Sequence, residues 1–161
     1  MVHLEPLSAD QAREIQTWRY EGEYAFYDSD DSPEVLRELL DGSYYGVQDS
    51  EGKLEGFFCY GSSAQVPAGR ELGLYEGERI LDIGLGLRPD RTGQGRGAAF
   101  LAIGLQFARS NWDPERLRLT VAAFNKRAIR LYKKAGFREI TTFQQKGIPF
   151  LLMVTSRQSH E

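Results

Sequence analysis

The segment from Arg88 to Gly97 places glycines and basic side chains where a strand is expected to give way to a helix. A helix start exposes unpaired N–H groups and carries roughly half a positive charge. Glycines let an anion approach this backbone closely, and arginines add charge-assisted hydrogen bonds. Because Arg88, Arg91 and Arg96 cluster in a chain of net charge −3, the segment predicts a phosphate site. The alternative is a solvated basic turn whose glycines permit a tight bend.

Two common nucleotide motifs do not explain this segment. The nucleotide P-loop requires a lysine and then serine or threonine directly after its second glycine, and the chain has no such run. Gly93, Gly95 and Ala98 match the dinucleotide-binding fingerprint in letters. That motif needs an acidic residue about 20 positions further on, after a strand, whereas Asp113 and Glu115 precede the next expected strand. A dinucleotide-dependent oxidoreductase is therefore a disfavoured alternative.

A second segment, from Asn125 to Phe137, predicts a helix with one inward face. Its apolar or aromatic residues recur at positions i, i+3, i+4 and i+7, namely Ala128, Leu131, Tyr132 and Ala135. Asn125 is a suitable N-cap, and Gly136 ends the helix. Tyr132 is either a core aromatic residue or a proton donor, because a phenol of pKa about 10 stays protonated at neutral pH.

Together the two segments resemble the conserved motifs of the GNAT superfamily of N-acetyltransferases. Residues 92–97 resemble motif A, written as Gln or Arg, two residues, Gly, one residue, and Gly or Ala. Thr92 departs from that pattern, which puts one side-chain phosphate contact in doubt but leaves the backbone donors unaffected. Residues 125–137 match motif B, Asn-x-x-Ala-x-x-Leu-Tyr-x-x-x-Gly-Phe, at every named position.

The resemblance implies acetyl-coenzyme A (acetyl-CoA) as co-substrate and direct transfer of the acetyl group to an amine, without a metal. It implies that Tyr132 protonates the departing thiolate and that Asn125 contacts the pantetheine arm or a nearby water. The implied cofactor-binding residues are Leu85, Gly86, Leu87, Arg88, Thr92, Gly93, Gln94, Gly95, Arg96, Gly97, Ala98, Asn125 and Tyr132. A non-catalytic acyl-CoA-binding sensor or interaction module is the alternative function.

The strand expected at Ile80–Leu87 carries the remaining candidates for the chemistry. Its glycines, Gly84 and Gly86, indicate a bulge or a close backbone approach, and the family splays this strand from the next one to admit pantetheine. The alternative is that the glycines only relieve packing. Alternation puts Asp82 on the face of these glycines, so Asp82 is the first candidate for the base that deprotonates the amine. Glu71 and Glu78 are weaker candidates, and a structural or substrate-orienting role for Asp82 stays open.

In this superfamily the first two helices and their connection line the acceptor side. Aromatic and acidic residues are interleaved in this part of the chain, which suits a cationic amine. The substrate-binding candidates are Trp18, Tyr24 and Tyr27, within a stretch that also holds Tyr20, Phe26, Glu21, Glu23, Asp28, Asp30 and Asp31. Ordinary packing with a solvated acidic turn is the alternative. A polyamine, an amino-acid-like amine and a protein N-terminus all remain open as acceptors.

Bulk properties narrow the class of protein. The 161 residues suit one domain spanning 1–161. The net charge and the lack of a membrane-length apolar run argue against nucleic acid and membrane partners, and the acetyl-CoA and amine partners leave a homodimer open. The N-terminus lacks the regions of a signal peptide, and the single cysteine, Cys59, suits a buried position in a cytoplasmic protein. The histidines, at the chain ends, offer no metal-ligand cluster.

The expected fold is α/β (α+β) and GNAT-like. It comprises a mixed, mostly antiparallel twisted sheet of about seven strands, flanked by four helices, with a splayed central parallel strand pair. Strands are expected at residues 2–7, 44–48, 54–60, 80–87, 117–123, 137–143 and 150–155. Helices are expected after Ser8, from Pro33 to Gly42, and at residues 95–110 and 125–135, with a loop at residues 62–77.

Overall fold

The computed structural model describes residues 3–155, which pack as two compact units. The first unit comprises residues 3–59 and 85–103, and the second comprises residues 60–84 and 104–155. Both units are discontinuous in sequence, because the strand Ile80–Leu87 and the helix Gly97–Trp112 each pass from one unit to the other. The expectation of a single domain stays a prediction.

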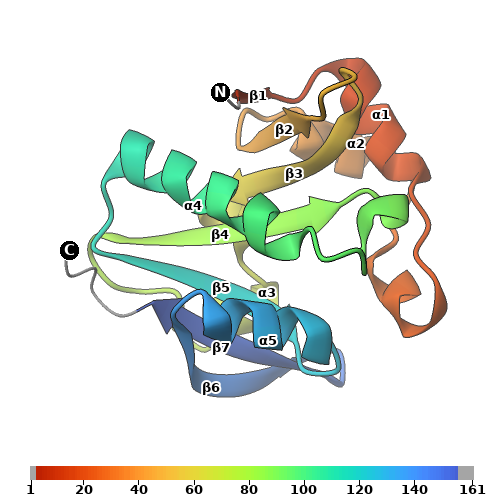
Figure 1. Ribbon diagram of the computed structural model, residues 1–161. Coiled ribbons are helices and arrows are strands. Elements are labelled where there is room, and N and C mark those ends of the chain that lie inside the picture. The colour runs from red at the N-terminus through yellow and green to blue at the C-terminus, as the bar shows by residue number, and fades with distance from the viewer. Residues whose placement is uncertain (1–2, 156–161) are drawn as a thin grey trace. The chain divides into compact units, whose positions relative to one another are not determined.

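Within the described residues, seven strands form one mixed sheet in the order β1-β2-β3-β4-β5-β7-β6 (Figure 1). The strands are β1 (Leu4–Pro6), β2 (Tyr44–Gln48), β3 (Leu54–Tyr60), β4 (Ile80–Leu87), β5 (Arg116–Ala122), β6 (Phe137–Gln145) and β7 (Ile148–Thr155). The β4–β5 pair is parallel, whereas β1–β2, β2–β3, β5–β7 and β6–β7 are antiparallel. The predicted mixed, mostly antiparallel sheet is therefore confirmed, although the first residue of the expected strand 2–7 lies outside the described range.

The described part of the chain has five α-helices instead of the four expected. They are α1 (Ala9–Thr17), α2 (Pro33–Leu39), α3 (Pro67–Glu71), α4 (Gly97–Trp112) and α5 (Lys126–Lys134). The addition is α3, within the segment 62–77 that was expected to be a loop. Pro67 occupies its first turn, where the fixed φ of proline suits a helix. Five residues are too few to give a helical hydrophobic period, so the pattern did not reveal this helix.

In the first unit, α1 begins with the cap that the sequence indicated. The Ser8 hydroxyl accepts a hydrogen bond from the Gln11 N–H (3.1 Å), and the Ser8 N–H donates to the Gln11 side chain (3.0 Å). The core of this unit is aromatic, with Phe58 stacked on Phe100 at 4.6 Å between ring centroids. Cys59 is buried, as predicted.

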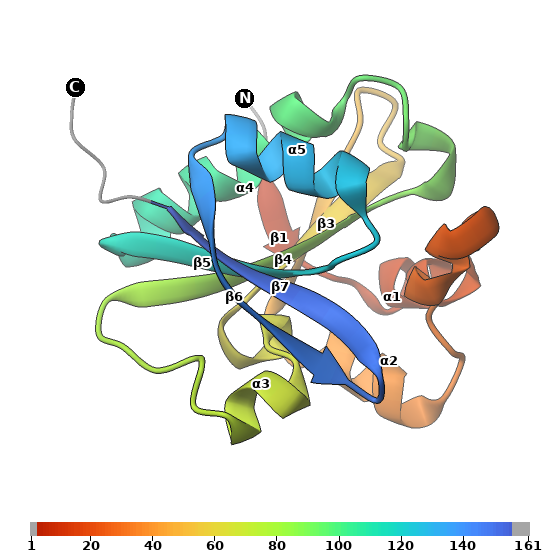
Figure 2. The ribbon, with the colours of Figure 1, turned by 90° about the horizontal axis from the view of Figure 1, so that it is seen from below.

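In the second unit, β7 lies between β5 and β6, and β6 continues into β7 through a tight turn (Figure 2). Both α3 and α5 contact β6. The Phe143 and Phe150 rings stack at 5.8 Å and pack with Ala122 in one buried cluster. A second aromatic group joins Tyr60 to Phe107 and Trp112, and the Tyr60 hydroxyl donates to the Gly104 carbonyl (2.8 Å).

The parallel pairing of β4 with β5 is short. Three residue pairs form the ladder, from Ile80 with Arg116 to Asp82 with Arg118. The ladder ends there, although both strands continue, and Ile83 in the same unit lies beyond it. This early end agrees with the expected splay of the parallel pair.

A buried ion pair closes this ladder. Asp82 and Arg118 are each only 4% exposed. The guanidinium donates to both carboxylate oxygens, at 2.6 and 2.9 Å. It also donates to the backbone carbonyls of Tyr75 (2.8 Å) and Glu76 (2.9 Å), and lies 5.3 Å from the Tyr75 ring centroid. Gln65 donates a further hydrogen bond to Asp82 (2.8 Å). Arg118 therefore ties the connection before β4 to the strand pair.

Replacing Arg118 by alanine is expected to lower the free energy of unfolding by about 3–5 kcal/mol, because it leaves the Asp82 carboxylate buried without its cation. Urea denaturation followed by circular dichroism measures this loss. The matched control is Arg116→Ala, at an exposed position of the same strand. It should change the free energy by less than about 0.5 kcal/mol. Equal effects of the two variants would show that the buried pair does not organise the unit.

Candidate cofactor loop and catalytic helix

The glycine loop, residues 92–96, joins a short 3₁₀-helix (Pro89–Arg91) to α4. Gly93 and Gly95 have φ values of 71° and 75°, a region that favours glycine. The Thr92 hydroxyl donates to the Pro89 carbonyl (2.8 Å), and the Gln94 side chain donates to the Asp90 carbonyl (2.6 Å). Thr92 and Gln94, both predicted cofactor contacts, therefore also shape the loop. The α-helix begins at Gly97, so the predicted strand–glycine loop–helix unit is present.

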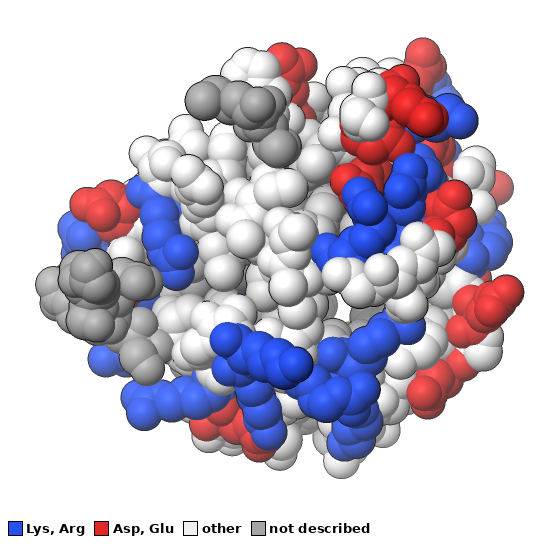
Figure 3. Space-filling view, in the orientation of Figure 1, with Lys and Arg blue, Asp and Glu red and all other residues white. Residues whose placement is uncertain are grey.

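The three arginines of this segment are each paired with a carboxylate. The pairs are Arg88 with Asp90 (2.6 Å), Arg91 with Asp49 (3.1 Å) and Arg96 with Glu55 (2.5 and 2.8 Å). Figure 3 shows basic and acidic side chains side by side over the β2–β3 turn and the segment that enters α4. The hydrogen bond from Arg88 lowers the pKa of Asp90 below its usual value.

Asp49 and Glu55 contact arginines of the candidate cofactor segment, and the sequence interpretation missed both of them. They precede their arginine partners by 42 and 41 residues, so no local spacing pattern could reveal the pairing. The strand order supplies the connection, because the Arg88 N–H donates to the Glu55 carbonyl at 2.8 Å, across β3 and the end of β4. The Arg88 guanidinium also donates to the neighbouring Leu54 carbonyl (2.9 Å).

The last residues of β4 are packed closely against β3 in the first unit. A Cβ atom added at Gly86 would lie 2.6 Å from the Phe57 ring, and one added at Gly56 would lie 2.5 Å from the Gly86 carbonyl oxygen. Gly86 is therefore required by packing, which was the alternative interpretation of this glycine. A predicted contact with pantetheine through its backbone is compatible with that requirement, because packing excludes only the side chain.

A tyrosine bridges β4 and the segment with the substrate-binding candidates. The Tyr20 hydroxyl donates to the Leu87 carbonyl (2.6 Å), and the Tyr20 N–H donates to Asp28 (2.8 Å). Burial, and secondarily the Asp28 charge, raises the pKa of Tyr20 well above its usual value, so the hydroxyl stays a donor. The sequence interpretation included Tyr20 only as one of several aromatics. The structure instead shows Tyr20 bonded to β4, the strand that is predicted to contact the cofactor.

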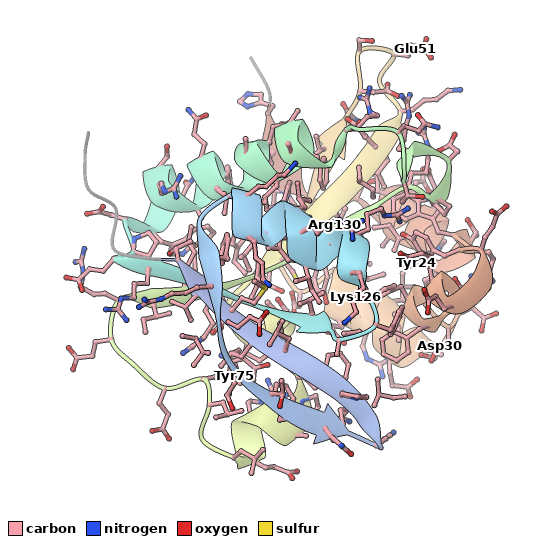
Figure 4. All side chains as sticks on the ribbon, turned by 60° about the horizontal axis from the view of Figure 1, so that its bottom comes forward. Tyr24, Asp30, Glu51, Tyr75, Lys126 and Arg130 are labelled. Atoms are coloured by element: carbon pink, nitrogen blue, oxygen red, sulfur yellow. The ribbon has the colours of Figure 1, made fainter. Side chains whose placement is uncertain are left out.

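The three substrate-binding candidates lie in different environments. Trp18 is 6% exposed and stacks on Phe57 at 6.3 Å, which favours its alternative role as a packing residue. Tyr24 and Tyr27 belong to a 3₁₀-helix, Gly22–Tyr27. Tyr24 is half-buried, and Tyr27 is 39% exposed with its ring edge-on to Phe26. Figure 4 shows Tyr24 within this short helix, ahead of Asp30.

The second unit carries the predicted catalytic helix, α5. The Asn125 side chain accepts a hydrogen bond from the Ala128 N–H (3.1 Å), so Asn125 is the N-cap. Tyr132 is 8% exposed, with its ring edge-on to Phe137 at 6.2 Å. It therefore lies on the inward face, as the periodicity predicted. Gly136 follows the helix with φ of 101°.

The outer face of α5 is basic. Lys126 and Arg130 are exposed on this helix (Figure 4). Lys133 pairs with Glu139 at 2.8 Å. The three candidates for the base also lie in this unit, and they differ in exposure. Glu71 and Glu78 are exposed, whereas Asp82 is buried in its ion pair. The contacts of Asp82 favour the structural role that the sequence left open, and its role as a base stays a prediction.

Comparison with known proteins identifies the class. The model of the acetyltransferase (GNAT) family matches residues 9–137, so the chain belongs to that family. No match is found among curated proteins. A chimeric spermidine N-acetyltransferase from Vibrio cholerae has a similar structure, with TM-score 0.72 and 19% identity over 96% of this chain and 95% of that one. A GNAT-family acetyltransferase from Bacillus anthracis has TM-score 0.72 and 14% identity over 96% and 94%.

Two structural features are absent from the described residues. Residues 3–155 contain no group of three or more metal-ligating side chains that could hold an ion. None of the helices in that range is long and apolar enough to cross a membrane.

The glycine loop can be tested through Gly95, because no atom lies within 4 Å of a Cβ added there. A side chain at this position therefore costs free energy only because the backbone has a positive φ. Gly95→Ala is expected to lower the free energy of unfolding by about 1–2 kcal/mol. Gly95→Asn should cost less, because asparagine tolerates this region better than alanine does. Urea denaturation compares the two, and an alanine variant as stable as the wild type would contradict the loop conformation.

Proposed function

We propose that this chain is an acetyl-CoA-dependent N-acetyltransferase that moves an acetyl group directly to a primary amine. Family membership carries the proposal, since the glycine loop and the capped helix α5 of the family's two motifs are both formed. We propose that the chain acts as one acetyltransferase domain in the cytoplasm.

The proposed cofactor contacts follow the sequence expectation, with one change of emphasis. The backbone from Gly93 to Ala98 would receive the pyrophosphate, because the start of α4 offers N–H donors that no turn of helix satisfies. The main chain of Leu85, Gly86 and Leu87 would pair with the pantetheine arm. The arginines are auxiliaries, because each already has a carboxylate partner.

The proposed reaction is attack of an uncharged amine on the thioester carbon. A C–N bond forms and the C–S bond breaks, while a backbone N–H near Leu85 stabilises the charge that develops on the carbonyl oxygen. Tyr132 donates its proton to the departing thiolate, and the proton that the attacking nitrogen loses restores the phenol through water. Asn125 orients the pantetheine arm or a water.

The amine must lose a proton before it attacks, so the reaction needs a proton acceptor. Asp82 was the first candidate, but Arg118 and Gln65 occupy both of its oxygens with hydrogen bonds. We therefore propose that the proton leaves through water. Asp82 in this scheme either receives it at the end of a water chain or holds the strand in place.

The proposed acceptor is a cationic amine. Acidic residues surround the 3₁₀-helix that holds Tyr24 and Tyr27, and carboxylates with aromatic faces attract ammonium groups. The similar Vibrio cholerae structure is that of a spermidine N-acetyltransferase, which is compatible with this class of acceptor. An amino-acid-like amine and a protein N-terminus also fit a cationic acceptor.

The proposal predicts that acetyl-CoA binds with Kd of about tens of micromolar or tighter, as measured by calorimetry on the full chain. A thiol-release assay across polyamines, amino acids and N-terminal peptides then identifies the acceptor. Absence of binding would refute the proposal. Binding with no thiol release for any amine would instead support the non-catalytic acyl-CoA-binding module.

The role of Tyr132 predicts that Tyr132→Phe lowers kcat by about 100-fold, because the thiolate loses its proton donor. Calorimetry should show nearly unchanged acetyl-CoA binding. The matched control is Tyr60→Phe, which removes another buried phenol from the second unit and should leave kcat nearly unchanged. If kcat of Tyr132→Phe equals that of the wild type, Tyr132 is a packing residue and not the general acid.

A further inference from the structure

The glycine loop lies against two buried carboxylates of the first unit. The side chains of Asp49 and Glu55 are only 7% and 9% exposed. Asp49 lies at the β2–β3 turn and Glu55 in β3. Each pairs with an arginine of the segment that enters α4, Arg91 and Arg96 respectively. A buried carboxylate next to a predicted anion site needs an explanation, because like charges repel most strongly where water is excluded.

Charge balance shows what these carboxylates do to the loop. Arg88, Arg91 and Arg96 bring three positive charges, and their partners Asp90, Asp49 and Glu55 bring three negative charges. The segment is therefore close to neutral at short range, although its sequence alone indicated a strongly basic site. Backbone N–H groups then supply most of the attraction for a phosphate.

The pairs are also held in place by the surrounding backbone. Asp49 accepts hydrogen bonds from the N–H groups of Glu51 (2.9 Å) and Lys53 (3.0 Å). These backbone bonds, with the Arg91 charge, lower the pKa of Asp49 below its usual value, so the carboxylate stays ionised. Arg96 directs two of its nitrogens at one oxygen of Glu55. The hairpin thus fixes two negative charges under the loop.

We propose that Asp49 and Glu55 are positioning residues that limit the affinity of the glycine loop for the phosphates of coenzyme A. By neutralising Arg91 and Arg96 they keep both acetyl-CoA and the product coenzyme A weakly held, which favours release after transfer. This inference rests on the proposed function, since it assumes that the loop receives the cofactor. It differs from a purely structural role, in which the carboxylates aim the arginines at the phosphates and so strengthen binding.

The test uses Glu55→Gln and Asp49→Asn, which remove the charge and retain a side-chain oxygen that can accept hydrogen bonds. Calorimetry at low ionic strength is expected to give Kd values for acetyl-CoA and coenzyme A about fivefold lower than those of the wild type. The gain should shrink as salt is raised, because salt screens the released arginine charges. Thermal unfolding of each variant verifies that the protein is folded.

The matched control is Glu51→Gln, which removes one charge from the same turn. Glu51 is exposed at the tip of the turn (Figure 4), and its side chain has no ion pair with any described residue. Its Kd should equal that of the wild type. Unchanged or weaker binding by folded Glu55→Gln and Asp49→Asn overturns the inference, as does an equal gain from Glu51→Gln. Wild-type protein that binds neither ligand refutes the proposed function itself, and this inference with it.

Discussion

A carboxylate that is shielded from water must be matched by a cation or by several hydrogen-bond donors, because an unpaired buried charge is strongly destabilising. This requirement organises both units. In the second unit, Asp82 is matched by Arg118 and Gln65, and the same guanidinium gathers the carbonyls of the connection before β4. In the first unit, Asp49 and Glu55 are matched by arginines of the segment that enters α4. The segments with the candidate site residues are therefore held by ion pairs with a shielded carboxylate as well as by apolar packing.

The ion pairs of the two units differ in whether the arginine keeps a side that an anion can reach. Arg118 is 4% exposed and uses its donors on the protein, so its role is structural. The Arg96 side chain is 41% exposed, while its partner Glu55 is buried. A guanidinium with one side held and the other facing solvent can meet an anion without leaving its carboxylate. The loop therefore combines a fixed backbone with a cation whose charge is partly offset.

Local patterns in the sequence predicted most helices and strands, but they did not predict ion pairs between residues far apart in the chain. The bounds of β2, β3 and β4 agree with the expected ranges, because turn residues and alternation mark both ends of each strand. Tyr132 on the inward face and Asn125 as the cap also followed from spacing. The partner of Asp82 lies 36 residues away, and helix α3 has only five residues. Neither feature produces a periodic signal, so the sequence could not show that Asp82 is held in an ion pair.

The end of β4 shows how packing and chemistry share one backbone. Gly86 has no room for a side chain beside Phe57, so a glycine at this position does not by itself indicate a ligand. The Leu87 carbonyl already accepts a hydrogen bond from Tyr20. A carbonyl oxygen has two lone pairs, so a pantetheine N–H can share this acceptor with the phenol. The Tyr20 hydroxyl and the cofactor would then be bonded to the same carbonyl oxygen. Because its N–H is bonded to Asp28, that contact reaches the acidic segment proposed for the amine. One tyrosine thus connects the strand proposed to contact the cofactor with the segment proposed for the amine, inside a single unit.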